Sequence, residues 1–193
     1  MKNITATLLA ALVLGAGFSQ SLQAAETYSI DATHSSVNFK IKHLGISWVN
    51  GSFKDYEGTV TFDPETPANS KISVSVDVTS VYTGSEDRDA HIQDDEYFNS
   101  AEWEKMTFES KKVEKTGDDT YKVTGDFTLR DVTKEITIEV TDLGGATGRQ
   151  GEKRRGGETS FIIKRSDYGM EGGAPLVGDE VHISLAFSAV EEG

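Results

Sequence analysis

Residues 71–78, Lys-Ile-Ser-Val-Ser-Val-Asp-Val, alternate strictly between polar and apolar side chains. A period of two residues is typical of a β-strand with one wet and one dry face, because successive side chains point to opposite sides of a sheet. The same alternation recurs in Val37, Phe39 and Ile41, and, with a slip near Gly125, over residues 120–130. So many half-buried strands need one shared apolar volume, and a sheet closed on itself is the simplest arrangement that supplies it.

We therefore predict an all-β fold, an antiparallel β-barrel of about eight strands. Short turn-forming links such as Asp63-Pro64 indicate that consecutive strands are antiparallel neighbours. Ser85 can cap a helix, and we predict one short helix near 86–94 over one end of the barrel. An interior of this size is either filled by side chains or able to hold one small molecule, and periodicity does not choose between them. The expected strands are 27–31, 35–43, 57–63, 71–80, 105–113, 120–130, 134–142, 158–165 and 180–190.

The first residues have the pattern of a secretory signal. Lys2 supplies a positive charge, residues 4–18 are mostly apolar, and Ala24 and Ala25 offer a cleavage site. We predict a cleaved signal peptide at 1–25, a periplasmic location, and a single domain at 26–193. The chain contains no cysteine, which excludes disulfides, thiolate metal sites and a lipid anchor at the signal junction.

The formal net charge is −13, and loss of Lys2 with the signal makes it −14. A surface this acidic repels nucleic acid phosphates and anionic lipid head groups, so we predict no nucleic acid partner and no stable membrane insertion. The glycine-rich stretch 144–157 is a local exception, with four basic residues. It is interpreted as a solvated loop, or alternatively as an anion-binding loop, whose glycines would permit a flap over the barrel mouth. The basic residues are Arg149, Lys153, Arg154 and Arg155.

The sequence offers little that is typical of an enzyme. Four histidines are scattered without a spacing that would place two on one helical face, and no Gly-x-Ser-x-Gly nucleophile turn occurs. We predict no catalytic residue, no metal site and no cofactor. The histidines are His34, His43, His91 and His182, the last of which should face solvent.

Several further motifs follow one another over nearly the whole chain after residue 25, at 34–39, 43–47, 51–53, 88–92, 97–98, 125–129, 132–134, 165–169 and 178–181. In this order they resemble the YceI-like family of exported lipid-binding proteins. The resemblance implies a lipocalin-like barrel whose inward residues line a cavity for an isoprenoid lipid, of the polyprenyl phosphate or isoprenoid quinone type. Two departures from the family pattern are Tyr82-Thr83 before the helix and Arg130-Asp131 at a hairpin turn. The first would alter the head-group end of the pocket, and the second is tolerable because Asp can enter the left-handed region.

The predicted ligand-binding residues form two sets. A phosphate head group would favour Arg88 or Arg165 at the rim, since a guanidinium can pair with two oxygens, and an ion pair with a neighbouring aspartate is the alternative for each. The inward set that would line the barrel is Val37, Phe39, Ile41, Phe62, Val74, Val76, Phe108, Phe127, Leu129, Ile138, Phe161, Ile163, Leu185 and Phe187. The head-group rim is expected to hold His43, Trp48, Phe53, Arg88, Asp89, His91, Arg165 and Asp167.

The favoured function is a periplasmic carrier of one isoprenoid lipid. Two alternatives stay open: a small enzyme for an apolar substrate, with His43 and Asp167 as acid and base, and a fully packed barrel that docks a protein partner. The sequence also leaves open whether the barrel forms a homodimer.

Overall fold

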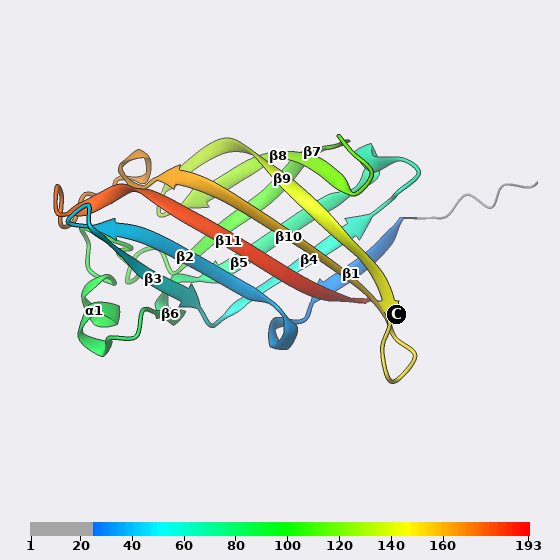
Figure 1. Ribbon diagram of the computed structural model, residues 1–193, viewed down its shortest axis with the longest axis horizontal. Coiled ribbons are helices and arrows are strands. Elements are labelled where there is room, and N and C mark those ends of the chain that lie inside the picture. Colours follow the sequence, from blue (N-terminus) through cyan, green and yellow to red (C-terminus); the bar gives the residue numbers. More distant parts are fainter. Residues whose placement is uncertain (1–24) are drawn as a thin grey trace, which may run out of the picture.

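The computed structural model describes residues 25–193, and the predicted signal peptide up to residue 24 lies outside the described residues. Strands dominate this part of the chain, with one short helix, α1 (Glu86–His91), whose N-cap Ser85 accepts a hydrogen bond from the backbone N–H of Arg88 (Figure 1). The short helix expected near 86–94 is thus confirmed. The strands are β1 (Glu26–Ile30), β2 (Ser36–His43), β3 (Ser47–Phe53), β4 (Tyr56–Phe62), β5 (Lys71–Asp77), β6 (Val81–Tyr82), β7 (Lys105–Lys115), β8 (Thr120–Leu129), β9 (Val132–Thr147), β10 (Lys153–Lys164) and β11 (Val177–Glu191).

The strands close into a barrel in which every neighbouring pair is antiparallel. The ring runs β1-β4-β5-β7-β8-β9-β10-β11 and returns to β1 through three residue pairs, among them Ser29 with Val190. The predicted antiparallel barrel of about eight strands is therefore confirmed. One edge of β11 pairs with β10, and its other edge is shared between two strands: residues 189–191 pair with β1, whereas residues 177–186 pair with β2. The ribbon β2-β3-β6 branches from β11, so the wall at that end is completed by β2, β3 and the segment around α1.

β3 was not among the expected strands. Its residues alternate weakly because Gly51 occupies an inward position and the bulky Trp48 an outward one. A Cβ atom on Gly51 would lie 2.3 Å from Cζ of Phe39, so the Phe39 ring fills the space that a side chain would need. Pairing with β2 across the tight turn at Leu44-Gly45 makes this segment a strand despite its weak pattern.

The glycine-rich stretch 144–157 is mostly strand rather than loop. β9 continues to Thr147 and β10 begins at Lys153, so residues 148–152 alone connect them. The connection lies at the end of the barrel opposite α1, beside the C-terminus (Figure 1). The interpretation of 144–157 as a loop is therefore wrong for most of the stretch, and the flap that its glycines would permit over the barrel mouth is not formed. At Gly157 a Cβ would lie 2.6 Å from Cζ of Phe187, so the Phe187 ring occupies the space that a side chain would need.

The inward face of β8 alternates without interruption, so the expected slip near Gly125 is also wrong. Its register with β9 is continuous, and Gly125 is buried in phase with Val123 and Phe127. The irregularity belongs to the neighbouring strand, because β7 shifts register between Ser110 and Lys112. The interior of the barrel is thus formed by one consistent set of side chains.

Candidate functional site

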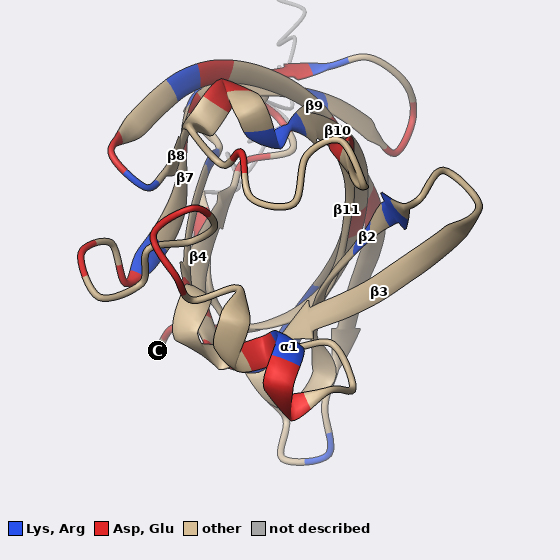
Figure 2. Cartoon of the chain, turned by 90° about the vertical axis from the view of Figure 1, so that its left-hand side faces the viewer, with Lys and Arg blue, Asp and Glu red and all other residues tan. Residues whose placement is uncertain are grey.

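The end of the barrel near α1 encloses a cavity of about 310 Å³. Figure 2 looks into this end, with α1 beneath the ring of strands. Most of the wall is apolar, and the volume lies at the lower end of the range of about 300–1,000 Å³ that is usual for ligand pockets. The wall comes from β2, β3, β7, β8, β10, β11 and the segment around α1, and it includes Val37, Phe39, Ile41, Val49, Met106, Phe127, Leu129, Ile163, Val181 and Ile183.

Two smaller spaces continue this cavity into the barrel. One of about 80 Å³ shares Val37, Phe127 and Ile183 with the first cavity, and one of about 40 Å³ shares Val60 and Phe187 with the second. The shared wall residues place the three apolar spaces one after another along the barrel. Every residue of the predicted inward set lines one of the three spaces. Periodicity left open whether side chains fill the interior or leave a space within it. The structure shows that the interior is hollow.

Arg88 lies at the wide end of the cavity. Its Nε donates to Oγ1 of Thr83 at 2.7 Å, and its Nη2 donates to the carbonyl oxygen of Thr83 at 2.8 Å. Asp89 points to the same threonine, accepting from its backbone N–H at 2.8 Å. Within residues 25–193, no carboxylate lies within ion-pair distance of the Arg88 guanidinium, so the aspartate pairing that was the alternative for Arg88 is not formed.

Arg165 also contacts the cavity, but its guanidinium is directed at the protein backbone. The residue is 5% exposed, and it donates to three carbonyl oxygens: those of Gly178 at 2.8 Å, Met170 at 2.9 Å and Val177 at 3.1 Å. Each of its three nitrogens is thus engaged in holding the loop before β11. Nearby Asp179 accepts from the backbone N–H of Ser166, and this hydrogen bond, helped by the Arg165 charge, holds the pKa of its carboxyl below the ordinary value.

The predicted rim residues divide into two groups. His43, Phe53, Arg88, His91 and Arg165 all line the cavity near α1. His43 and His91 are exposed, which marks this end as the one that reaches solvent, and Phe53 belongs to the apolar wall, in ring contact with Phe39 and Phe98.

Trp48, Asp89 and Asp167 lie outside the cavity wall, contrary to their predicted place. Trp48 is on the outer face because Val49, its neighbour in β3, takes the inward position. Asp167 is exposed and forms an ion pair with Lys134 at 3.1 Å. Tyr82 is also outside, 53% exposed beneath Lys54, so Thr83 rather than Tyr82 contributes to the cavity wall.

Sequence reasoning missed wall residues that do not belong to regular strands. Ile92, Tyr97 and Phe98 come from the segment after α1, where no period indicates which side chains face inward. Met170 follows the turn after β10.

Arg130, at the hairpin turn that departs from the family pattern, carries the left-handed φ of +58° in place of Asp131. It is held there by donating to the carbonyl of Tyr97 at 3.2 Å and by lying 4.9 Å from the Trp103 ring centre.

Charged side chains lie at the opposite end of the barrel. The Arg155 guanidinium lies 3.5 Å from the Phe62 ring centre and pairs with Asp142, and these residues line the innermost space. Lys153 and Arg154 also have carboxylate partners, so the anion-binding alternative for this basic stretch has no support from them.

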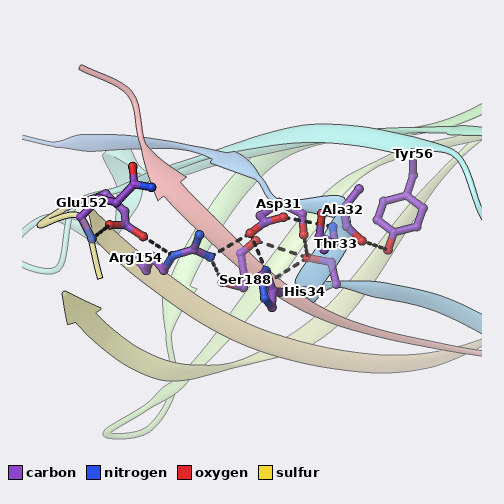
Figure 3. Close-up of polar contacts among 10 residues, drawn as sticks. Asp31, Ala32, Thr33, His34, Tyr56, Glu152, Arg154 and Ser188 are labelled. Carbon is purple, nitrogen blue, oxygen red and sulfur yellow. Dashed lines mark hydrogen bonds and ion pairs between the residues drawn. The ribbon is translucent and has the colours of Figure 1, made fainter. Parts of the chain in front are cut away.

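Asp31 links the basic stretch at this end of the barrel to the 3-10 turn before β2. Figure 3 shows its carboxylate between Arg154 and His34, at 2.8 Å and 2.7 Å. These hydrogen bonds, that from Arg154 being the larger cause, hold the pKa of Asp31 well below its ordinary value. His34 thus serves a structural contact far from His43.

No helix among residues 25–193 has the length and apolar character needed to cross a membrane. Within the same residues, no group of three or more histidine and acidic side chains is placed to hold a metal ion.

A closed antiparallel barrel with a hollow, apolar interior that reaches solvent at one end defines the class of lipocalin-like barrels. The model of the YceI-like domain matches residues 28–189, and the chain belongs to this family. It is 38% identical to Protein YceI of Escherichia coli O17:K52:H18 over 99% of this chain and 98% of the relative, and 37% identical to Protein YceI of Shigella flexneri over the same shares.

Solved structures agree with this fold. The YCEI protein of Campylobacter jejuni is 34% identical with a TM-score of 0.70, covering 79% of this chain and 90% of that one. Burkholderia cenocepacia BcnA gives a TM-score of 0.76 at 24% identity, covering 83% and 99%. A polyisoprenoid binding domain from Saccharophagus degradans gives 0.67 at 19% identity, covering 86% and 98%. At 24% and 19% identity, the likeness to BcnA and to the polyisoprenoid binding domain concerns the fold alone.

Proposed function

We propose that residues 26–193 form a periplasmic, non-enzymatic binding protein that holds one isoprenoid lipid with its tail inside the barrel. The observation that carries the proposal is the apolar cavity of about 310 Å³ near α1, followed along the barrel by two smaller apolar spaces. Each buried methylene contributes about 0.8 kcal/mol, so a hydrocarbon tail gains affinity from such a wall without specific polar contacts. The polyisoprenoid binding domain that shares this fold supports the ligand class, and the signal-like residues 1–25 support export.

The head group is proposed to be a phosphate, contacted by Arg88. This guanidinium lies at the solvent-reaching end of the cavity and, within the described chain, has hydroxyl and carbonyl partners but no carboxylate. A phosphate oxygen would complete its charge pairing, because N–H donors on a cation bind anions more strongly than neutral groups. Arg165 is a weaker candidate, since three backbone carbonyls already accept from it.

The enzyme alternative has lost its main support. Its acid and base were to be His43 and Asp167, but Asp167 is exposed, pairs with Lys134 and does not line the cavity. The packed-barrel alternative needed a filled interior, which differs from the hollow one described above.

The tail-binding part is tested by Val49→Trp, which places an indole into the cavity from β3. Protein isolated from the periplasm should release a stoichiometric isoprenoid lipid on extraction, measured by mass spectrometry, and Val49→Trp should release at least about tenfold less. The matched control is Asn50→Trp, the next residue along the strand, whose side chain lies on the exposed outer face. Equal lipid content in the two variants, or a consistently empty unmodified protein, would refute the proposal.

The head-group part is tested by Arg88→Gln. Its affinity for a polyprenyl phosphate should fall about tenfold or more, whereas its affinity for a quinone with the same tail should change little, because the quinone carries no charge. Competition between the two lipids in detergent measures the preference. An equal loss for both lipids would assign Arg88 to the architecture of the rim rather than to the head group.

A further inference from the structure

The turn between β2 and β3 exposes apolar side chains at the rim of the cavity. Ile46 is 84% exposed and Leu44 is 51% exposed. Leu176, 56% exposed, lies beside them, because its carbonyl accepts from the backbone N–H of Leu44 at 2.7 Å. Clustered aliphatic side chains of this size at a hairpin tip add nothing to the core, and exposed apolar patches of this kind mark contact surfaces.

Leu44 also occupies an unfavourable backbone conformation. Its φ is +53°, that of Gly45 is +72°, and the backbone N–H of Ile46 donates to the carbonyl of His43 at 3.2 Å. A β-turn whose two central residues both have positive φ values favours Asn or Asp in the first of them, and a bulky apolar residue there is an outlier. Neither the turn nor the core explains why this position is leucine, which points to a role outside the fold.

The charge of the hairpin is opposite to that of the chain. Residues 32–54 contain no aspartate or glutamate but three lysines, Lys40, Lys42 and Lys54, although the whole chain has 32 acidic residues. On the outer face the Trp48 ring is 37% exposed and lies 4.9 Å from Nζ of Lys40 and 4.2 Å from Nζ of Lys42. Aliphatic tips, a half-exposed tryptophan and neighbouring lysines together are the side chains that anchor proteins at a membrane–water interface.

We propose that the β2–β3 hairpin docks reversibly on a bilayer that contains anionic phospholipids. Leu44 and Ile46 enter the acyl region, Trp48 lies at head-group level, and Lys40 and Lys42 face lipid phosphates. The acidic residues of α1 lie at a different part of the rim (Figure 2), so the barrel meets the bilayer with the hairpin side. Repulsion by the remaining negative charge keeps docking weak and salt-sensitive.

Docking would bring the cavity to the membrane surface. Ile41, His43 and Val49 of the same hairpin line the cavity, whereas Leu44 and Ile46 do not. A hydrocarbon tail could therefore pass between bilayer and barrel along one short apolar path. This inference concerns an outer surface, and it holds for whichever apolar molecule the cavity takes.

The test uses Trp48 as its reporter. The chain has two tryptophans, so Trp103→Phe leaves Trp48 alone. With vesicles of phosphatidylglycerol and phosphatidylcholine, Trp48 emission should shift to the blue, brominated acyl chains should quench it, and the protein should sediment with the vesicles. Binding should fall at least fivefold in high salt and on pure phosphatidylcholine vesicles.

The matched variants separate docking from folding and from loading. Leu44→Asn/Ile46→Asn in the same background should lose vesicle binding by about tenfold or more while keeping the fold, because Asn suits the turn. It should also take up lipid from detergent normally. The control Leu143→Asn removes a leucine that is 62% exposed on β9, at the other end of the barrel, and should bind vesicles unchanged.

Three results would overturn the proposal: vesicle binding that survives Leu44→Asn/Ile46→Asn, a Trp48 spectrum unaltered by bound vesicles, or an equal loss of vesicle binding in Leu143→Asn. A hairpin variant that alters only the oligomeric state in sedimentation equilibrium would assign the tip to contact between two copies of the chain instead.

Discussion

Arg88 and Arg165 lie at the same end of the barrel, but their guanidinium groups meet different acceptors. Arg165 is buried and donates to three backbone carbonyls, so its charge stabilises the loop before β11. Arg88 is half-exposed and uses one side of its guanidinium on Thr83. Both residues are arginines in the sequence, but Arg165 has a structural role, whereas Arg88 is proposed to contact the ligand.

Arg165→Lys should lower the free energy of unfolding by about 2–4 kcal/mol, because a lysine reaches fewer of the three carbonyls and leaves buried acceptors without a donor. Arg88→Lys is the matched control and should change it by less than about 1 kcal/mol. Urea unfolding of the ligand-free proteins measures both. Similar losses of unfolding free energy in the two variants would contradict the structural role assigned to Arg165 alone.

Asp31→Asn should destabilise the protein in a pH-dependent way. The pKa of Asp31 is lower in the folded protein than the ordinary value of 3.8, so the ionised carboxylate stabilises the fold. This contribution is complete above about pH 4 and is lost as the pH falls through the lowered pKa. The difference in Tm between the two proteins should be largest near neutral pH and shrink in strong acid. The control is Asp118→Asn, a substitution at an exposed turn residue. A Tm difference between Asp31→Asn and the unmodified protein that grew on acidification would contradict the prediction.

At the scale of the elements, the inward positions of β8 show why one glycine is needed. A Cβ at Gly125 would lie 2.4 Å from the carbonyl oxygen of Glu109 and 2.7 Å from Cζ of Phe108. This close approach of β7 to Gly125 lies beside the irregularity of β7 between Ser110 and Lys112. A backbone carbonyl cannot move aside as a flexible side chain can.

Gly125→Ala is therefore expected to lower the free energy of unfolding by about 1–3 kcal/mol, the usual cost of overpacking. Gly156→Ala is the control, since its nearest contact would be the Phe187 carbonyl at an ordinary 3.5 Å. Chemical denaturation compares the two. Equal stability of both variants would show that β7 relaxes without cost at its bulge.

At the scale of the whole molecule, the hollow interior makes stability depend on occupancy. An apolar space of this kind forfeits dispersion contacts until a ligand fills it. The proposed lipid binds the folded state and not the unfolded one, so it stabilises by about 2.7 kcal/mol at a free concentration of 100 times Kd.

Delipidated protein should accordingly melt at a lower temperature than protein isolated with its lipid, and adding the lipid should restore the Tm. In Val49→Trp the two forms should melt alike, because the cavity of that variant is occupied by its own side chain. Differential scanning calorimetry makes the comparison. A Tm that is indifferent to delipidation in the unmodified protein would mean that the interior is not where the lipid binds.

The alternating residues by themselves determined the barrel and its lining. Period two decides which side chains share a face, and that is a local property of each strand, so the inward set from Val37 to Phe187 could be predicted before any tertiary contact was known. The cap of α1 at Ser85 is equally local. The resemblance to the YceI-like family likewise came from motifs present in the sequence.

The tertiary structure alone decided what depends on residues far apart in the chain. The hollow exists because facing walls stop short of each other, and no single strand encodes that distance. Trp48 faces outward because β3 pairs with β2, the glycine-rich stretch became strand because β9, β10 and β11 align, and Arg165 became structural because the 170–178 loop surrounds it. These outcomes are set by which segments meet in space, a relation between distant residues that local periodicity does not contain.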